Sequence, residues 1–302
     1  MNGGILVSYS IGQRIKDLRE YFNITQKELC NGICSQGLIS RIEKDEVSPT
    51  ALVLEQIARR LSVDMNYFFD EIHNYGNNYI ELTKRTIDKK IRECNYEEVL
   101  QIITIEKNSP LFKSDQLKQY MLWREAICVF HVKHDEKRAL ELLEAALNIG
   151  TASPKIISEY ELHIYQSKAI IYSMTNKLDE AAEIYKQLVQ KINSLTHIKH
   201  KRLMINIYYN AGVNAYDRQD YEEAIKLVDY ALTLCIDEDY LYLLGQLFFL
   251  YGIALFDHDH KNKAESLKYL DKALFIFTLK NNQANIESVE EEKVRVANTK
   301  VT

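Results

Sequence analysis

One helical segment recurs five times in the last two thirds of the chain, and this repetition constrains the fold most. The segments occupy residues 96–107, 136–147, 178–189, 221–232 and 262–274. The small or aliphatic residues that open them are Val99, Ala139, Ala181, Ala224 and Ser266. Their successive spacings are 40, 42, 43 and 42 residues. A near-constant period of this length predicts a solenoid of helical units that share one continuous core.

The rest of the chain is also predicted to be helical. Only three prolines and ten glycines interrupt 302 residues, which favours long helices joined by short connections. The apolar run at 240–256 is too long for one strand and indicates a buried helix. We therefore expect an all-α protein.

The repeats resemble a known helical unit. In the fourth segment Tyr221 is followed by small residues at Ala224 and Ala231, a pattern similar to the second helix of a tetratricopeptide repeat. The usual unit has about 34 residues, so these repeats are longer. The resemblance implies a right-handed solenoid of five helix pairs over residues 96–302. The charged residues 285–302 are expected to fray or to form a polar cap.

The first seventy residues contain several helix-start signals. Thr25 and Glu28 have the spacing of a capping box, and Ser35 is a candidate N-cap. Ser48 followed by Pro49 predicts a cap with proline at the first helical position. These signals predict five short helices, at 11–22, 25–32, 36–45, 49–61 and 64–71.

A polar stretch follows this first unit. Residues 71–95 are charged and helical in pattern, with a hinge expected at Gly76. The predicted organisation is therefore a five-helix domain at 1–70, a helical linker at 71–95 and the repeats at 96–302.

The segment TQKELCNGICSQGLISRIEKDEVSP resembles the helix-turn-helix of phage-repressor-like (XRE-type) DNA-binding domains. A short helix can enter the major groove of DNA. Gln36 could pair with adenine, and Arg41 with guanine or a phosphate. The full set of expected DNA-binding residues is Gln26, Ser35, Gln36, Gly37, Ser40, Arg41 and Lys44. The resemblance also implies a structural ion pair between Arg19 and Glu43.

Charge alone does not predict DNA binding. Residues 1–70 hold eight Lys or Arg and nine Asp or Glu, and the whole chain has a formal charge of −5. The alternative is a small helical domain that binds only protein. The spacing of the caps and polar residues favours DNA binding over that alternative.

The first helix of each repeat carries polar or aromatic residues within an apolar run. An Asn or Gln side chain offers both a donor and an acceptor to an extended peptide. The expected peptide-binding residues in the repeats are Arg124, Gln166, Tyr209, Asn210 and Gln246. The alternative is that these side chains pair with one another or with water inside the solenoid.

The combined order of domains resembles the PlcR-type quorum-sensing regulators of Gram-positive bacteria, within the peptide-sensing RRNPP group. The resemblance implies that a short, secreted and re-imported peptide binds the concave face at positions matching Arg92, Gln166, Asn210 and Gln246. It also implies homodimers that bind palindromic DNA. The alternative is a Rap-like protein whose repeats bind a response regulator, but residues 71–95 leave no room for the additional helical bundle of that group.

Other functions find no support in the sequence. The pairs His131–His134 and His197–His200 lack nearby acidic or cysteine ligands, so no metal is expected. No phosphate-binding loop or hydrolase motif is found, so neither a cofactor nor enzymatic activity is expected. No signal peptide or membrane span is predicted. The five cysteines are consistent with a reduced, cytoplasmic protein.

Overall fold

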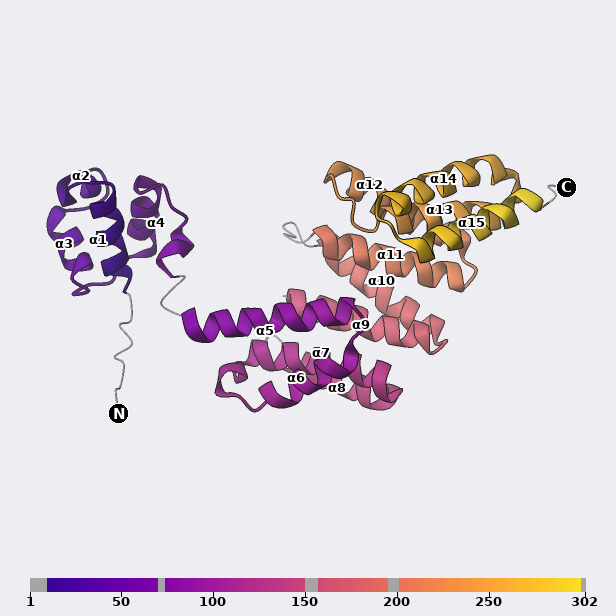
Figure 1. The fold of residues 1–302 in the computed structure, drawn as a ribbon, viewed down its shortest axis with the longest axis horizontal. Coiled ribbons are helices and arrows are strands. Elements are labelled where there is room, and N and C mark those ends of the chain that lie inside the picture. The colour runs from indigo at the N-terminus through magenta and orange to yellow at the C-terminus, as the bar shows by residue number, and fades with distance from the viewer. Residues whose placement is uncertain (1–9, 70–73, 150–156, 195–200, 300–302) are drawn as a thin grey trace. The chain divides into compact units, whose positions relative to one another are not determined.

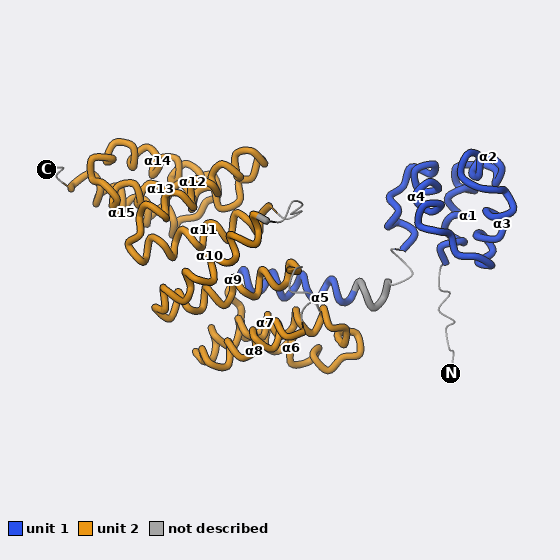
Figure 2. Tube along the Cα trace, turned by 180° about the vertical axis from the view of Figure 1, so that it is seen from behind, with its two compact units in different colours: residues 1–93 blue, residues 94–302 orange. Residues whose placement is uncertain are grey.

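A computed structural model describes residues 10–69, 74–149, 157–194 and 201–299. The described residues are helical apart from turns and short connections, as the sequence predicts (Figure 1). The chain divides into two compact units, residues 1–93 and 94–302 (Figure 2). Among the described residues, no helix combines the length and the hydrophobicity that a bilayer span requires.

The first unit begins with the predicted short helices. Its elements are α1 (Ile11–Tyr21), α2 (Gln26–Cys30), α3 (Gln36–Glu43), α4 (Ala51–Arg60), the 3₁₀ helix η1 (Met65–Phe68) and α5 (Asn74–Arg92). The capping box at Thr25 is confirmed, because its side chain accepts from the backbone of Glu28 while Glu28 accepts from Thr25. Ser35 caps α3 by accepting from the backbone N–H of Leu38. A buried cluster around Ile15, Leu29 and Ile57 joins α1–α4 and η1.

The predicted start of the fourth helix is wrong. Thr50, not Ser48, is the N-cap, because its hydroxyl accepts from the backbone N–H of Val53 and the helix begins at Ala51. The fifth predicted helix is shorter than expected. Its backbone bonds, such as Tyr67 to Asp64, span three residues, which is the 3₁₀ pattern.

The predicted linker is largely one helix, α5. Gly76 lies inside this helix, so the hinge expected at this glycine is wrong. Residues 70–73, which join α5 to η1, lie outside the described residues, as do residues 1–9, His197 and His200.

The second unit contains the repeats. It consists of α6 (Tyr96–Glu106), η2 (Pro110–Phe112), α7 (Asp115–Lys133), α8 (Glu136–Asn148), α9 (Glu159–Met174), α10 (Leu178–Ser194), α11 (Lys201–Asp217), α12 (Tyr221–Asp237), α13 (Leu244–His258), η3 (His260–Asn262), α14 (Lys263–Leu279) and α15 (Gln283–Asn298). Every predicted recurring segment is a helix, namely α6, α8, α10, α12 and α14. Four helix pairs lie between α6 and α15. The helix that precedes α6 is α5, which the sequence assigned to the linker.

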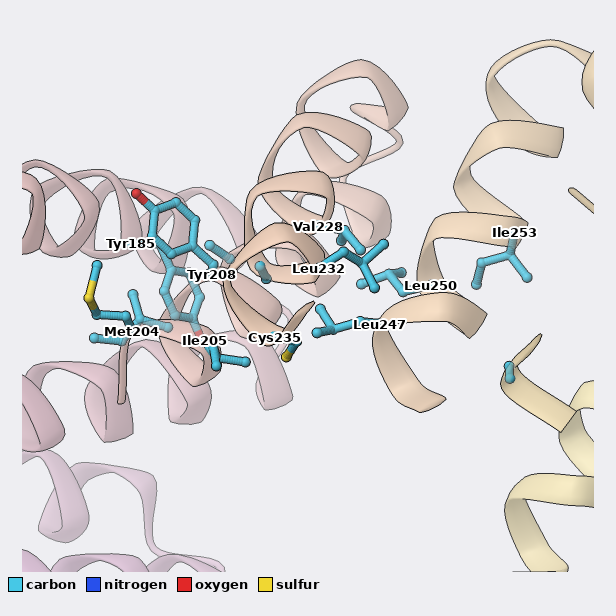
Figure 3. Close-up of a cluster of buried hydrophobic side chains, with 14 of the residues drawn as sticks. Tyr185, Met204, Ile205, Tyr208, Val228, Leu232, Cys235, Leu247, Leu250 and Ile253 are labelled. Atoms are coloured by element: carbon cyan, nitrogen blue, oxygen red, sulfur yellow. The ribbon is translucent and has the colours of Figure 1, made fainter. Parts of the chain in front are cut away.

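Two layers build the repeat unit. The first helices of successive pairs, α7, α9, α11 and α13, each contact the next. We call this row of helices the first-helix layer. Each of them also packs on the second helix of its own pair. The core between the layers contains Tyr208 of α11, Val228 and Leu232 of α12, and Leu247 and Leu250 of α13 (Figure 3).

Helix α15 closes the far end of the repeats. Val289 and Val296 are completely buried, and the helix packs on α13 and α14. Residues 283–298 therefore form the expected polar cap and do not fray. Lys263 fixes the end of this helix by donating to the carbonyl oxygens of Ala297 and Thr299 at 2.6 and 3.0 Å.

Candidate functional site

Helix α3 presents a polar face to solvent. Gln36, Gly37, Arg41 and Lys44 are exposed, and Ser40 is half-buried. Spacings of three and four residues place these side chains on one side of the helix. The opposite side, with Ile39 and Ile42, is fully buried in the core of the domain. Most of the residues that the sequence assigned to DNA binding therefore lie together on one accessible surface.

Gly37 has no packing role in this helix. A Cβ atom added at this position would meet nothing within 4 Å, and its φ is not positive. We expect Gly37→Ala to raise the free energy of unfolding of this domain by about 0.5–1 kcal/mol, because glycine loses more backbone entropy in a helix than alanine does. Hydrogen exchange of α3 in the full chain would measure the change. Slower exchange is expected, and faster exchange would contradict the conclusion that Gly37 has no packing role.

A buried carboxylate holds α1, α2 and α3 together. Glu43 of α3 accepts two hydrogen bonds from the Arg19 guanidinium, at 2.6 and 2.9 Å. It also accepts one from the Gln26 side-chain amide at 2.8 Å. The predicted Arg19–Glu43 pair is thus present. Hydrogen bonding to Glu43 raises the pKa of Arg19, so the guanidinium keeps its charge despite partial burial.

Gln26 has a second role that the sequence did not predict. It was expected to contact DNA, whereas in the structure its side-chain amide donates to Glu43. The start of α2 still has backbone N–H groups that can bind an anion. Gln26 therefore connects the start of α2 to the last residue of α3.

The first-helix layer contains two buried amide atoms with no partner among the described residues. Gln166 of α9 is 4% exposed, and its Nε2 donor makes no hydrogen bond. Gln246 of α13 is half-buried, and its Oε1 acceptor is likewise unpaired. An unsatisfied buried polar group costs about 1–3 kcal/mol. Such groups in a native protein need a physical explanation, and one explanation is a ligand absent from the structure.

An aromatic cluster lies beside Gln166. Arg124 of α7 stacks on Trp123, with its guanidinium carbon 3.5 Å from the ring centroid. Trp123 in turn stacks on His163 of α9 at 5.0 Å and donates to the Ser167 hydroxyl at 2.8 Å. These contacts fix the side chains of α7 against α9. They also place the only tryptophan of the chain in the first-helix layer.

The other expected peptide-binding residues have different surroundings. Asn210 donates to Asn206 of the same helix at 3.2 Å, and Tyr209 is half-buried. Asn214, four residues further along α11, is buried and donates to Ser173 and to the Leu178 carbonyl oxygen, so it joins neighbouring helices. Among the expected residues, the internal-pairing alternative therefore applies in part to Asn210. Arg92 is exposed as the last residue of α5, in the first unit.

An ionic network holds α15 on the repeats. Arg295 donates to both oxygens of Asp257 on α13, at 2.8 and 3.1 Å, and to Glu292 at 2.6 Å. The Tyr216 hydroxyl of α11 donates to the same Asp257 at 2.6 Å. Side chains of α11 and α15 therefore both bind the carboxylate of Asp257 on α13.

We expect Arg295→Ala to loosen α15. The substitution removes a bidentate, charge-assisted contact of the kind worth about 1.5–3 kcal/mol. Amide hydrogen exchange in α15 should become roughly ten-fold faster, while exchange in α7 and α8 stays unchanged. Lys293→Ala, which removes the more exposed pair with Asp271, is the control and should have less than half this effect.

A helix-turn-helix followed by stacked helix pairs with unpaired amides in one layer defines a helix-turn-helix regulator with a helical-repeat domain. The profile of the RNPP family C-terminal domain matches residues 84–296, and a helix-turn-helix profile matches residues 15–68. The chain belongs to the RNPP family of peptide-responsive helix-turn-helix transcription regulators. This membership indicates a DNA-binding regulator.

Solved structures share the fold. Bacillus thuringiensis PlcR in complex with the peptide PapR7 and DNA has a TM-score of 0.77 and 23% identity, over 93% of this chain and 98% of that chain. ComR from S. thermophilus, in complex with DNA and its signalling peptide ComS, has a TM-score of 0.64 and 18% identity, over 95% and 100%. The SHP pheromone receptor Rgg2 of Streptococcus dysgalactiae has a TM-score of 0.65 and 16% identity, over 95% and 99%. A search of curated protein sequences finds no match.

Proposed function

We propose that this chain is a cytoplasmic transcription regulator that binds a palindromic operator as a homodimer and responds to a short re-imported peptide. In this proposal residues 1–70 bind DNA, residues 71–95 link the domains, and residues 96–302 bind the peptide and dimerise. The observation that carries it is the unpaired Nε2 donor of Gln166, buried in the repeat domain of an RNPP-family chain. PlcR and ComR have been solved with both DNA and peptide, which supports the same pair of ligands here.

The exposed face of α3 supports the DNA half of the proposal. One such helix offers few base contacts, so specific binding needs two of them spaced about one DNA turn apart. Lys44 and the half-buried Ser40 lie on the exposed side of the helix, where phosphates would pass. Peptide occupancy would alter the spacing only if the peptide binds one arrangement of the dimer better than the other.

Peptide titration tests the sensing half. Synthetic peptides of five to eight residues, taken from the ends of short secreted reading frames beside the gene, would be titrated by calorimetry into the full chain. Binding should be lost or strongly weakened in Gln246→Ala and Asn210→Ala. Gln187→Ala, which removes an exposed amide from a second helix, should bind normally. Equal binding by all variants would contradict the assigned surface.

DNA selection tests the other half. An operator selected by the full-length protein from random duplexes should be a palindrome with half-sites about one turn apart. Arg41→Ala should weaken its binding by about ten-fold or more. The Rap-like alternative predicts that no operator is selected. Residues 71–95, most of which form α5, are too few for the additional helical bundle of that group.

A further inference from the structure

Large apolar side chains are exposed at one corner of the repeat unit. The corner is formed by the last turn of α12, the loop at 238–243 and the last two turns of α14. Five side chains there are 37–63% exposed, namely Ile236, Leu241, Tyr242, Phe275 and Leu279. We call these five residues the apolar corner. Surface loops are normally polar, whereas the chain enters α13 through the apolar run YLYLL at 240–244.

Two contacts join the loop to both helices. Lys280, just after α14, donates to the carbonyl oxygen of Leu241 at 2.8 Å. The Cys235 thiol of α12 donates to the carbonyl oxygen of Tyr242 at 3.3 Å. The α12 and α14 members of the apolar corner are direct neighbours of these two anchoring residues in the sequence. The two members on α14 are four residues apart, which places them on one face of that helix. The five side chains therefore lie together, unlike single exposed apolar residues, which are normal on any protein.

The backbone of this loop is strained. Leu243, the N-cap of α13, has a φ of 56°, in the left-handed region that glycine and asparagine usually occupy. Strained residues persist only where the surrounding structure fixes them, and they concentrate at functional sites. A polar loop with glycine at this position would avoid both the strain and the exposed apolar surface. The loop therefore presents Leu241 and Tyr242 to solvent at a cost to stability.

Charges of both signs surround the apolar corner. Residues 237–239 at the end of α12 are three successive exposed acids. Two exposed bases are Lys280 and Arg202, and the Arg202 guanidinium carbon lies 5.7 Å from the ring centroid of Tyr242. A surface with an apolar centre and both signs on its rim can pair acid with base when it meets a copy of itself turned about a two-fold axis.

The area of the apolar corner also fits a second copy of the chain. A large apolar side chain presents roughly 200 Å² when it is fully accessible, so the five offer on the order of 500–600 Å². A stable interface buries about 800 Å² on each partner, as an apolar centre with a polar rim. The apolar corner and its charged rim together reach this size. None of the five residues belongs to the first-helix layer, so this surface is separate from the one that we assign to the peptide.

We propose that the apolar corner is the surface through which two copies of this chain dimerise. The contact is isologous: the leucine and aromatic side chains of one copy pack on those of the other, and the acids at 237–239 face the bases of the partner. This inference rests on the proposed function, which assigns dimerisation to residues 96–302, and it specifies where and by what chemistry the copies meet.

Sedimentation velocity of the full-length protein, over a range of concentrations, tests the surface. The wild-type protein should sediment as a dimer. Leu241→Glu and Leu279→Glu should each raise the dissociation constant by about ten-fold or more, and by about a hundred-fold together, because each places an unpaired charge in the apolar centre. Ile105→Glu is the matched control, since Ile105 of α6 is 72% exposed and lies outside the apolar corner. It should leave the dimer unchanged.

Cross-linking gives a second readout that does not depend on weakening the protein. Cys94 is the exposed native cysteine, so the test uses a Cys94→Ser background. In that background Leu241→Cys should form a covalent dimer with a short bismaleimide, because a two-fold contact brings the two copies of this residue close together. Ile105→Cys, treated in the same way, should remain a monomer on a denaturing gel.

The outcomes separate this surface from the proposed function. Wild-type dimers that persist in both glutamate variants, or an Leu241→Cys protein that cross-links no better than Ile105→Cys, refute the apolar corner and leave the homodimer in place. Equal dissociation by Ile105→Glu also refutes it, because the effect would then come from added charge alone. A wild-type protein that stays monomeric at every concentration, with and without the selected operator, refutes the homodimer of the proposed function itself.

Discussion

Glu43→Ala is expected to destabilise the helix-turn-helix domain by about 3–5 kcal/mol and to abolish specific DNA binding. The side chain of Glu43 is 3% exposed, and that of its partner Arg19 is 11% exposed. Removing the carboxylate leaves a largely buried guanidinium without its counter-ion, which costs far more than the pair itself contributes. Gln26 loses its acceptor in the same step, so the start of α2 is no longer held against α3.

Hydrogen exchange of α1–α3 in the full-length protein would measure this loss, since it reports the local opening free energy of one domain within a larger chain. Binding to the selected operator would be followed by fluorescence anisotropy. Glu46→Ala is the matched control, because Glu46 and Arg41 form a pair 3.8 Å apart with both side chains more than half exposed. That substitution should cost less than about 1 kcal/mol. Equal effects of the two substitutions would refute the structural role of Glu43.

Local signals in the sequence were sufficient to predict the helices and some of the residues at which they begin. Thr25 and Ser35 were identified as caps because a cap bonds to a residue only three positions away. The same reasoning gave the wrong cap at Ser48, because Thr50 lies two residues further along and offers an equivalent hydroxyl. Nothing local distinguishes these two candidates, and the packing of α4 in the domain decides between them.

The recurring segments were predictable for a different reason. Each repeat buries the same small residue against its neighbour, as at Ala139, Ala181 and Ala224, which are all completely buried. Because the core needs a small residue at the same place in each repeat, the sequence shows a regular period. The helices of the first-helix layer gave weaker signals, because their buried faces contact several neighbours and lack a simple apolar stripe. Helix α5 was assigned to a linker for a different reason, namely the polar and charged composition of residues 71–95.

The candidate peptide site could be predicted only as a set of polar residues. Gln166 and Asn214 look alike in sequence, since each is an amide within an apolar helix. Their partners lie in other helices, and only the structure shows that Asn214 is satisfied while Gln166 retains an unpaired donor. The partner of Asp257 was likewise hidden in the sequence, because Arg295 lies 38 residues further along the chain.

Glycines show the same limit. The sequence gives no sign that Gly12 of α1 and Gly37 of α3 differ, and both lie inside helices where alanine is favoured. In the structure a Cβ at Gly12 would lie 1.9 Å from the carbonyl oxygen of Ile42 and 2.6 Å from an Asp45 carboxylate oxygen. The backbone of α1 therefore touches the end of α3, and Asp45 also accepts from the Gly12 N–H at 3.2 Å.

Gly12→Ala should therefore destabilise this domain by about 3 kcal/mol or more, at the upper end of the cost of overpacking. The atom that it meets is backbone, which cannot rotate away, so α1 and α3 must separate. That separation displaces Ile42 and Glu43, the residues that fix the recognition helix, and operator binding should fall with stability. Gly37→Ala is the same chemical change 25 residues away and should stabilise the domain. Hydrogen exchange of both variants gives the test, and a Gly12→Ala protein as stable as Gly37→Ala would refute the close contact between α1 and α3.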